Sequence, residues 1–218
     1  TDPCDYYINP YYNANPTAGS IPSRKETFDQ LQPKISISYQ PSDRVTYFAS
    51  YGIGFRSGGF NSQGTTATLE QFFGNLTTAD GTKNLNDLSD SFDKEISKAF
   101  ELGFKSRLLE NPLVLNGAIY FTDTEDMQDF SFFAGPFGSL RVVTNIDEAE
   151  IRGAEIDFKW RASNNLTVYG GIGVTDTEIK KYSTRPYTAG NKLPYIPEAT
   201  GNFGVEYVSM VGSGWEFL

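Results

Sequence analysis

Apolar and polar side chains alternate along several long runs of this chain, and the clearest pair lies between Val142 and Thr175. The first run places apolar side chains on one face and charged ones on the other: Ala154, Ile156, Phe158 and Trp160 against Glu155, Asp157, Lys159 and Arg161. The second run begins at Leu166, after a corner of residues 162–165 that are typical of turns. Because successive side chains of a strand point to opposite faces, this pattern predicts a hairpin with one apolar and one polar face.

The same alternation predicts seven complete antiparallel strands in meander order, with an eighth that begins at Trp215: 34–40, 44–57, 95–109, 113–125, 146–161, 166–180 and 198–209. Part of 95–109 also fits a helix, but the alternation persists and Gly103 lies in its middle, which favours a strand. Most of these runs are long enough to cross a membrane as tilted strands, which takes about 9–11 residues.

The register predicts which side chains share a face. We expect an apolar, lipid-facing set and an inward, polar set: Phe55, Phe104, Ile119, Ile156, Val168 and Val205 against Arg56, Lys105, Glu155 and Lys159.

The connections alternate between short polar corners and longer segments rich in Gly, Asn, Thr and aromatic residues. The longer ones are 1–27, 57–94, the segment with Phe130, Phe132, Phe133 and Phe137, and 182–197. Tight turns on one side and long loops on the other are typical of a bacterial outer-membrane barrel. Aromatic residues also gather near the short corners, as at a membrane interface: Tyr39, Tyr47, Trp160, Tyr207 and Trp215.

We therefore predict an all-β fold, an antiparallel meander that forms an arc of a large transmembrane barrel. Residues 1–27 are expected to be an extracellular loop, and 28–218 to hold strands with short periplasmic turns and longer extracellular loops. The glycines on the polar face are too small to fill an eight-stranded barrel, so the strand at 34–39 should not pair with the run from Trp215.

Composition narrows the chemistry. The net charge is −9, and the chain has no His and one Cys, Cys4. A nucleic-acid binder would more often be basic, and neither a zinc site nor a Ser/His or Cys/His pair can be built. The acidic run of Asp123, Glu125, Asp126 and Asp129 lacks the spacing of a calcium loop, which favours a solvated loop. We predict no enzyme activity, metal or cofactor.

Five segments, in order along the chain, resemble the barrel of a TonB-dependent outer-membrane receptor: SYGIGFRSGGFN (50–61), FELGFKS (100–106), LNGAIYFTDTEDMQ (115–128), NIDEAEIRGAEID (145–157) and PYIPEATGNFGVEY (194–207). The resemblance implies a place in the bacterial outer membrane. It also implies a barrel of the 22-stranded type, of which this chain would hold roughly strands 12 to 19, and a plug domain that lies outside this chain.

The resemblance further implies active import of a scarce nutrient, with a ferric siderophore as the first choice and cobalamin, haem or an oligosaccharide as alternatives. The partners would be outer-membrane lipid, the plug and the remaining strands, a small-molecule ligand, and the TonB complex through parts not in this chain. A soluble all-β binding or adhesion module is the alternative from another class.

Two sets of candidate site residues follow. The charges on the polar face would be costly in lipid, at about 2–4 kcal/mol for each Lys or Arg at the midplane, so we expect them to face the lumen or the plug: Arg56, Glu101, Lys105, Arg107, Glu155, Asp157, Lys159, Arg161 and Glu206. Ligand contacts are expected at the outer rim, by loop position, from Phe60, Asn61, Phe132, Phe133, Arg141 and Tyr187. The aromatic ones could equally pack the loops.

Overall fold

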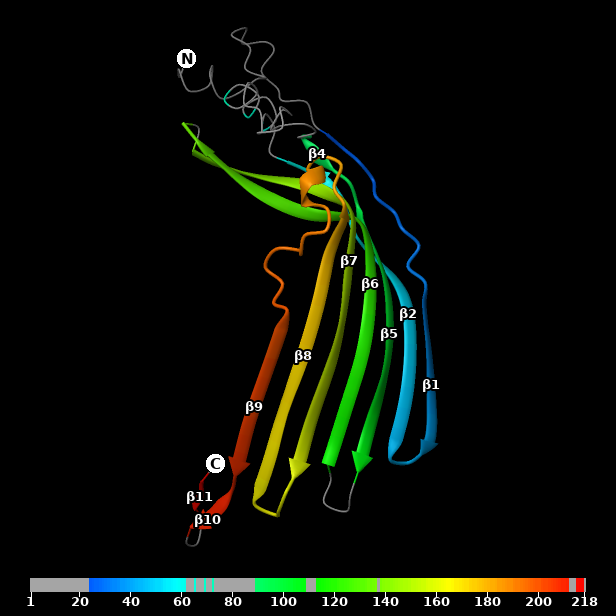
Figure 1. Cartoon of the computed structure of the whole chain (residues 1–218), viewed down its shortest axis with the longest axis vertical. Helices are drawn as coiled ribbons and strands as arrows, with labels where there is room; N and C mark the ends of the chain where they lie inside the picture. Colours follow the sequence, from blue (N-terminus) through cyan, green and yellow to red (C-terminus); the bar gives the residue numbers. More distant parts are fainter. Residues whose placement is uncertain are drawn as a thin grey trace.

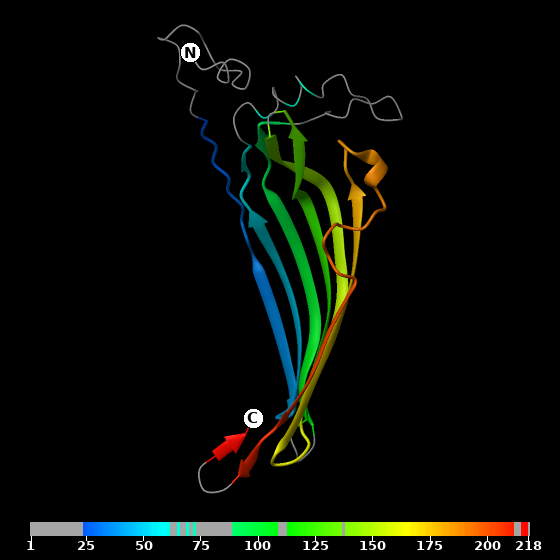
Figure 2. The same cartoon turned by 90° about the vertical axis from the view of Figure 1, so that its left-hand side faces the viewer.

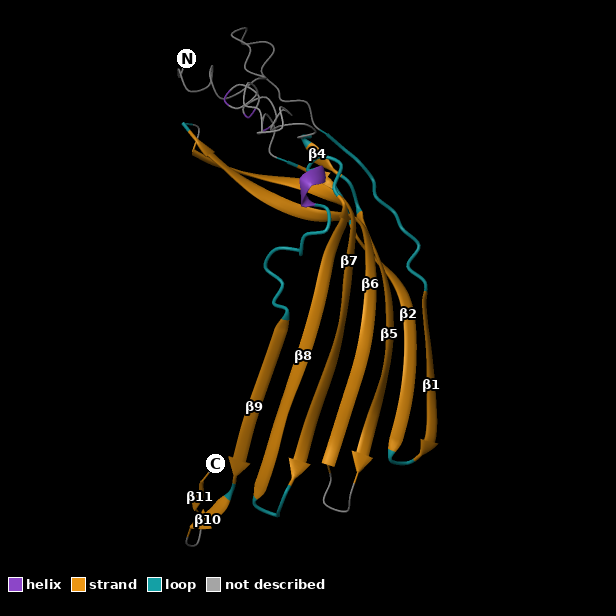
Figure 3. Ribbon diagram, in the orientation of Figure 1, coloured by secondary structure: helices purple, strands orange, loops and turns teal. Residues whose placement is uncertain are grey.

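The structure is a computed structural model that describes residues 24–61, 89–108, 113–136, 138–211 and 215–217, with isolated positions 65, 69 and 72. It is built almost wholly of strands (Figure 3). The seven long strands are β1 Lys34–Ser42, β2 Val45–Arg56, β5 Glu95–Leu108, β6 Leu113–Gly135, β7 Gly138–Arg161, β8 Leu166–Lys181 and β9 Ala199–Tyr207. The short elements are β3 Gly59–Phe60, β4 Ser91–Phe92, β10 Ser209–Val211, β11 Trp215–Phe217 and the 3-10 turn η1 Pro186–Thr188.

The seven long strands form one sheet in the order β1-β2-β5-β6-β7-β8-β9 (Figure 1). Every pair in it is antiparallel. The predicted meander is therefore confirmed, and residues 95–108 form a strand and not a helix. In the part of the chain that the structure describes, no helix is long and apolar enough to cross a membrane.

The two ends of the sheet differ. The short connections between β1 and β2 and between β7 and β8 lie at the bottom of Figures 1 and 2, together with the β10–β11 hairpin. The longer connections and η1 lie at the top. We refer to these as the turn end and the loop end. The long β8–β9 connection, between Lys181 and Ala199, agrees with the predicted asymmetry, whereas the loop expected between β6 and β7 is instead a hairpin, because β6 ends at Gly135 and β7 begins at Gly138.

Cross-strand register assigns the side chains to the two faces. Phe104 lies opposite Tyr47 on β2 and Gly117 on β6, and Gly117 lies opposite Ile156, which lies opposite Ile172. Paired residues share a face, so these rows place the six predicted apolar residues on one face and the four predicted charged residues on the other. The predicted register is confirmed.

The predicted strands 113–125 and 146–161 were too short. Residues expected to form a loop instead extend β6 and β7 into a hairpin whose ladder runs to Gly135 and Gly138. Asp123, Glu125 and Asp129 therefore lie in a strand and not in a solvated loop, and so do Phe130, Phe132 and Phe133. Phe137 lies outside the described residues.

The cause of the misassignment is Asp126. It has a positive φ of 52°, and its pairing with β7 is interrupted, while Glu125–Glu148 and Met127–Ile146 keep one register on either side. The local kink breaks the alternation that predicts a strand, without ending the ladder. Beyond it the hairpin swings across the top of the sheet (Figure 1).

The predicted strand 198–209 ends at Tyr207, and Trp215 begins a strand that pairs only with β10. Among the described strands, β1 and β9 form opposite edges of the sheet and do not meet. The prediction that this chain does not close into a small barrel is confirmed.

The small core lies at the loop end, on the polar face of β7 and β8. Ala149 and Ile179 lie opposite one another on these strands, and Ile146, Tyr182 and Leu193 pack with them. The β8–β9 connection is held over this cluster by a hydrogen bond from the Ile179 amide to the Asn191 carbonyl, 2.8 Å long. This core fixes the connections at the loop end to the sheet.

Candidate functional site

A hollow of about 430 Å³ opens at the loop end, between the chain after β2, β4 and the base of the β6–β7 hairpin. Its lining combines three aromatic rings with charged and amide side chains: Arg56, Phe60, Asn61, Phe92, Gln128, Asp129, Phe130, Arg141 and Val143. Three of the six predicted rim residues, Phe60, Asn61 and Arg141, therefore lie together. We refer to this hollow as the rim hollow.

Asn61 is buried and its amide is occupied. The side chain donates to the carbonyls of Ser89 and Val143, at 2.9 and 2.8 Å, and accepts from the Val143 amide at 2.8 Å. The same bonds fasten the β2–β5 connection to β7. Asn61 thus shapes the wall of the rim hollow, and its polar atoms are directed at backbone.

Two further amides make the same kind of fastening. Asn145 accepts from the Asp93 amide at 2.8 Å and donates to the Asp126 carbonyl at 2.7 Å. Gln128 donates to the Ser57 carbonyl at 2.8 Å. We refer to Asn61, Gln128 and Asn145 as the amide latch. It holds both ends of the β2–β5 connection against the base of the hairpin.

The two guanidinium groups of the rim hollow differ in their partners. Arg56 forms an ion pair with Glu95, and the Glu95 carboxylate also accepts a hydrogen bond of 2.8 Å from the backbone N–H of Gln128. Arg141 lies with its guanidinium 4.8 Å from the centre of the Phe130 ring. Among the described residues it forms no ion pair, so its charge is available to a ligand that enters the hollow.

The other three predicted rim residues lie outside the hollow. Phe132 is 66% exposed on the hairpin, with its ring 5.7 Å from that of Phe130. Phe133 follows it in β6. Tyr187 lies on η1 and is 67% exposed. A hydrogen bond of 3.0 Å from Arg185 to Ser131 connects the η1 loop to the hairpin.

The polar face of the sheet carries the second predicted set. A shallow hollow of about 530 Å³ is lined there by Glu101, Lys105, Glu155 and Asp157, among others. Asp157 accepts a hydrogen bond of 3.0 Å from Asn116, and the Lys105 ammonium lies 5.8 Å from the centre of the Phe48 ring. Within the described residues, none of the predicted polar-face charges except Arg56 forms an ion pair.

Glycines let aromatic rings lie flat on this face. A Cβ at Gly153 would overlap the Tyr120 ring, whose hydroxyl is 2.8 Å from the Thr175 hydroxyl on the far side of β7. This close packing requires a glycine at position 153. Among the described residues, no group of three or more His, Cys, Asp or Glu side chains is arranged to hold a metal ion.

Residues 5–218 match the family described as TonB dependent receptor-like, beta-barrel. The chain belongs to this family. TonB-dependent receptors are β-barrels of the bacterial outer membrane, so the apolar face of the sheet contacts lipid and the long strands are part of a barrel wall. The soluble-module alternative is thereby set aside.

Several members of the TonB-dependent receptor family are similar to this chain. The pesticin receptor of Yersinia enterocolitica is 24% identical over 173 residues, which cover 79% of this chain and 22% of the receptor. Among solved structures, the ferric yersiniabactin uptake receptor FyuA from Yersinia pestis superposes with a TM-score of 0.57 at 21% identity, over 83% of this chain and 23% of FyuA. The copper transporter OprC superposes with a TM-score of 0.54 at 17% identity, over 80% of this chain and 23% of OprC. The chain thus spans under a quarter of the length of these relatives.

Sequence reasoning missed part of the rim hollow. Phe92 and Phe130 line it, and Asn145, the first residue of the resembling segment 145–157, holds its wall. An available signal was the occurrence of Asn61, Gln128 and Asn145 next to expected strand ends, where side-chain amides commonly bond to free backbone groups.

Proposed function

We propose that this chain forms part of the barrel wall of a receptor that actively imports a ferric siderophore across the outer membrane. Arg141 is the observation that carries the choice of cargo. A ferric chelate is held by oxygen donors that bring negative charge, and an unpaired guanidinium beside aromatic rings complements such a ligand. The name of FyuA, a ferric yersiniabactin uptake receptor, supports the same class of cargo.

The polar face supports a place around a plug. Among the described residues, its predicted charges other than Arg56 form no ion pair, whereas Lys98, Arg152 and Lys180 on the other face are paired. Charged groups that a protein encloses are normally paired or hydrated. We propose that Glu101, Lys105, Arg107, Glu155, Asp157, Lys159, Arg161 and Glu206 face a water-filled lumen and a plug domain, whose movement by the TonB complex would release the cargo inward.

The test of cargo uses the protein purified from outer membranes in detergent. Binding of catecholate, hydroxamate and phenolate ferric siderophores is measured by fluorescence quenching. Haem, cobalamin, an oligosaccharide and a copper complex are titrated in the same way as alternative cargoes. We expect one ferric siderophore to bind. Binding only of another cargo would overturn the proposal.

The contribution of Arg141 is tested separately. Arg141→Ala should weaken binding of that siderophore by about 10- to 100-fold, because a hydrogen bond to a charged group contributes about 1.5–3 kcal/mol. Arg141→Lys should recover part of the loss, and uptake of radioactive iron by cells should follow the same order. Arg161→Ala, near the turn end of the polar face, is the matched control and should leave affinity unchanged.

A further inference from the structure

Charged side chains interrupt the apolar face at the loop end. From the turn end along the apolar face, each of the strands β5, β6, β7 and β8 is uncharged up to one level, where a charged residue follows. The uncharged part ends at Phe100, Phe121, Ala154 and Val174, and the next residues on that face are Lys98, Asp123, Arg152 and Asp176. Four neighbouring strands thus change character at nearly the same height.

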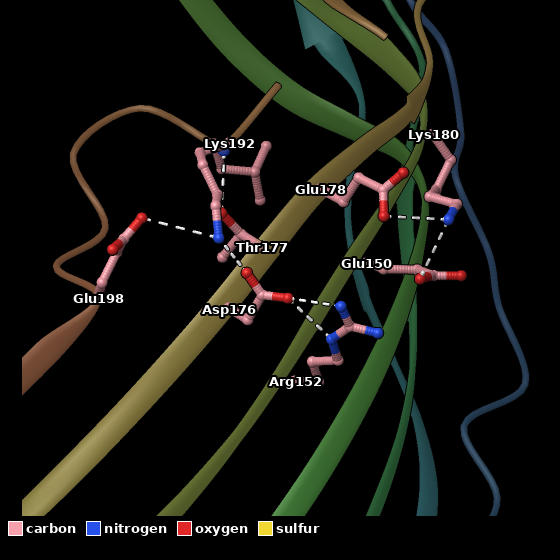
Figure 4. A network of polar contacts seen from close by, with 9 residues as sticks. Glu150, Arg152, Asp176, Thr177, Glu178, Lys180, Lys192 and Glu198 are labelled. Atoms are coloured by element: carbon pink, nitrogen blue, oxygen red, sulfur yellow. Dashed lines mark hydrogen bonds and ion pairs between the residues drawn. The ribbon is translucent and has the colours of Figure 1, made fainter. Parts of the chain in front are cut away.

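Most charges at this level are paired, in three separate groups, two of which are drawn in Figure 4. Arg152 contacts Asp176 at 2.6 Å, and Lys180 bridges Glu178 and Glu150 at 3.1 and 3.5 Å. Lys98 pairs with Glu125, and Lys192 pairs with Asp176 and lies 3.6 Å from Glu198. We define the charged belt as Lys98, Asp123, Glu125, Glu150, Arg152, Asp176, Glu178, Lys180, Lys192 and Glu198.

The belt carries formal charges at the surface of the sheet. The side chains of Arg152 and Lys192 are 59% and 52% exposed. The hydrogen bond that Lys192 donates to Asp176 raises the pKa of the lysine, which keeps it protonated. Such a surface cannot lie in hydrocarbon, yet it continues the face that contacts lipid.

The lower edge of the apolar face runs parallel to the belt. We take Tyr47 on β2 and Trp160 on β7 as marks of this edge. Tyr47 lies opposite Phe104 of β5, whereas Trp160 lies in the same row as Leu108 of β5, which is four residues nearer the turn end. The upper boundary shifts in the same direction, from Lys98 on β5 to Arg152 on β7, which is one cross-strand row lower. Two boundaries that cross the rows in the same oblique sense are expected where tilted strands pass through one layer.

The thickness between these boundaries fits a membrane. Trp160 and Arg152 are eight residues apart on β7, as are Tyr207 and Ala199 on β9, where the strand begins next to Glu198. With a rise of about 3.3 Å per residue and a tilt of about 40°, this is about 20 Å of membrane height, close to the apolar band of about 25 Å in outer-membrane barrels.

We infer that the charged belt is the surface on which the wall contacts the charged headgroup layer of the outer leaflet. The hydrocarbon boundary follows the lower edge of the belt, which crosses the rows obliquely from Lys98 on β5 to Arg152 on β7. Both signs of charge occur along the belt, which suits a layer where phosphates and their counter-ions alternate. The inference concerns lipid contact and does not depend on the cargo.

Depth measurements with spin labels test this. In the full protein carrying Cys4→Ser, single cysteines replace Ile119 or Ile172 below the belt and Asp123 or Glu178 within it, and Ser50 on the polar face is the reference. Each labelled protein is placed in phosphatidylcholine vesicles that contain a lipid with a Ni²⁺-chelating headgroup. We expect the headgroup Ni²⁺ to increase relaxation several-fold more at Asp123 and Glu178 than at Ile119, Ile172 or Ser50, and oxygen collisions to be highest at Ile119 and Ile172.

Three results would overturn the inference. Equal relaxation at Asp123 and Ile119 would place the belt at the same depth as the apolar band. Weak relaxation at belt positions that remain open to a water-soluble nickel complex would place them above the headgroups. Belt positions shielded from all reagents would indicate that a protein covers them. A failure to bind ferric siderophores would leave each of these readouts unchanged.

Discussion

At the scale of single residues, the contact between Tyr120 and Gly153 is the most demanding one on the polar face. The ring covers the glycine and reaches Thr175 across β7. We predict that Gly153→Ala lowers the free energy of unfolding by about 1–3 kcal/mol, the usual cost of overpacking, because the added methyl group displaces the ring. The free energy of unfolding is measured by titrating the purified protein with urea. The folded fraction at each urea concentration is read from the electrophoretic band of the folded protein in unheated samples.

Gly54 provides the matched control for that substitution. It also lies within a long strand, but a Cβ built there has no heavy atom within 4 Å. Gly54→Ala should therefore change the midpoint of unfolding little. Equal losses in the two variants would mean that the ring contact is not what requires a glycine at position 153.

At the scale of elements, the amide latch decides how firmly the β2–β5 connection is held. The side chain of Asn145 makes three hydrogen bonds to the backbone: it accepts from the N–H of Asp93 and donates to the carbonyls of Asp93 and Asp126. We predict that Asn145→Ala increases hydrogen exchange of the peptides around residues 89–94 by about tenfold, since it removes three hydrogen bonds to the backbone and a typical bond contributes about 0.5–1.5 kcal/mol. Mass spectrometry after deuterium labelling measures the change.

Asn116→Ala is the control for this experiment. It removes the hydrogen bond to Asp157 on the polar face but does not touch the connection. The exchange of residues 89–94 should stay at the value of the unchanged protein. An Asn145 variant with the same exchange as this control would show that other contacts hold the segment.

The sequence predicted the strands wherever the alternation of apolar and polar residues was regular. The structure shows why the upper half of the β6–β7 hairpin and the rim hollow were not predicted. A period of two marks a strand only while the backbone stays extended, so the positive φ at Asp126 concealed the upper half of the β6–β7 hairpin. The rim hollow escaped prediction for a related reason. Phe92 and Phe130 are far apart in sequence and lie in different sheets, and the amide latch holds their segments together. Phe60 and Arg141 were found from their expected position at the outer rim, although Arg141 lies in β7 and not in a loop.

The charged belt escaped for a different reason. Lys98 and Arg152 lie at positions of the apolar face, so each on its own is an irregularity in an alternating run. Their meaning depends on neighbouring strands having the same irregularity at the same height. That height follows from the pairing register, which a sequence specifies through turn geometry and packing together.

At the scale of the whole molecule, the seven-stranded sheet keeps its first and last long strands apart. We predict that cysteines at Ser36 and Ser50, which lie opposite one another on β1 and β2, are joined in high yield by a short bis-maleimide crosslinker in a Cys4→Ser background. Opposed residues of antiparallel strands have Cα atoms about 4.5–5.5 Å apart, which allows this.

Cysteines at Ser36 and Thr200 should remain unlinked under the same conditions, because β1 and β9 are the opposite edges of the sheet. Electrophoresis with and without a protease cut between the two positions distinguishes the products. An efficient Ser36–Thr200 crosslink within one molecule would mean that the sheet closes into a narrow barrel, and the receptor architecture would be excluded.

The ladder of β6 and β7 continues past the charged belt to Gly135 and Gly138. At Gly138, an added Cβ would have no heavy atom within 4 Å, so the tip is open to a longer loop if that glycine keeps its positive φ of 88°. A foreign peptide grafted there would extend an existing hairpin without shifting the register of any membrane-spanning strand. We therefore predict that an epitope grafted at Gly138 is displayed on living bacteria, which would place the loop end outside the cell.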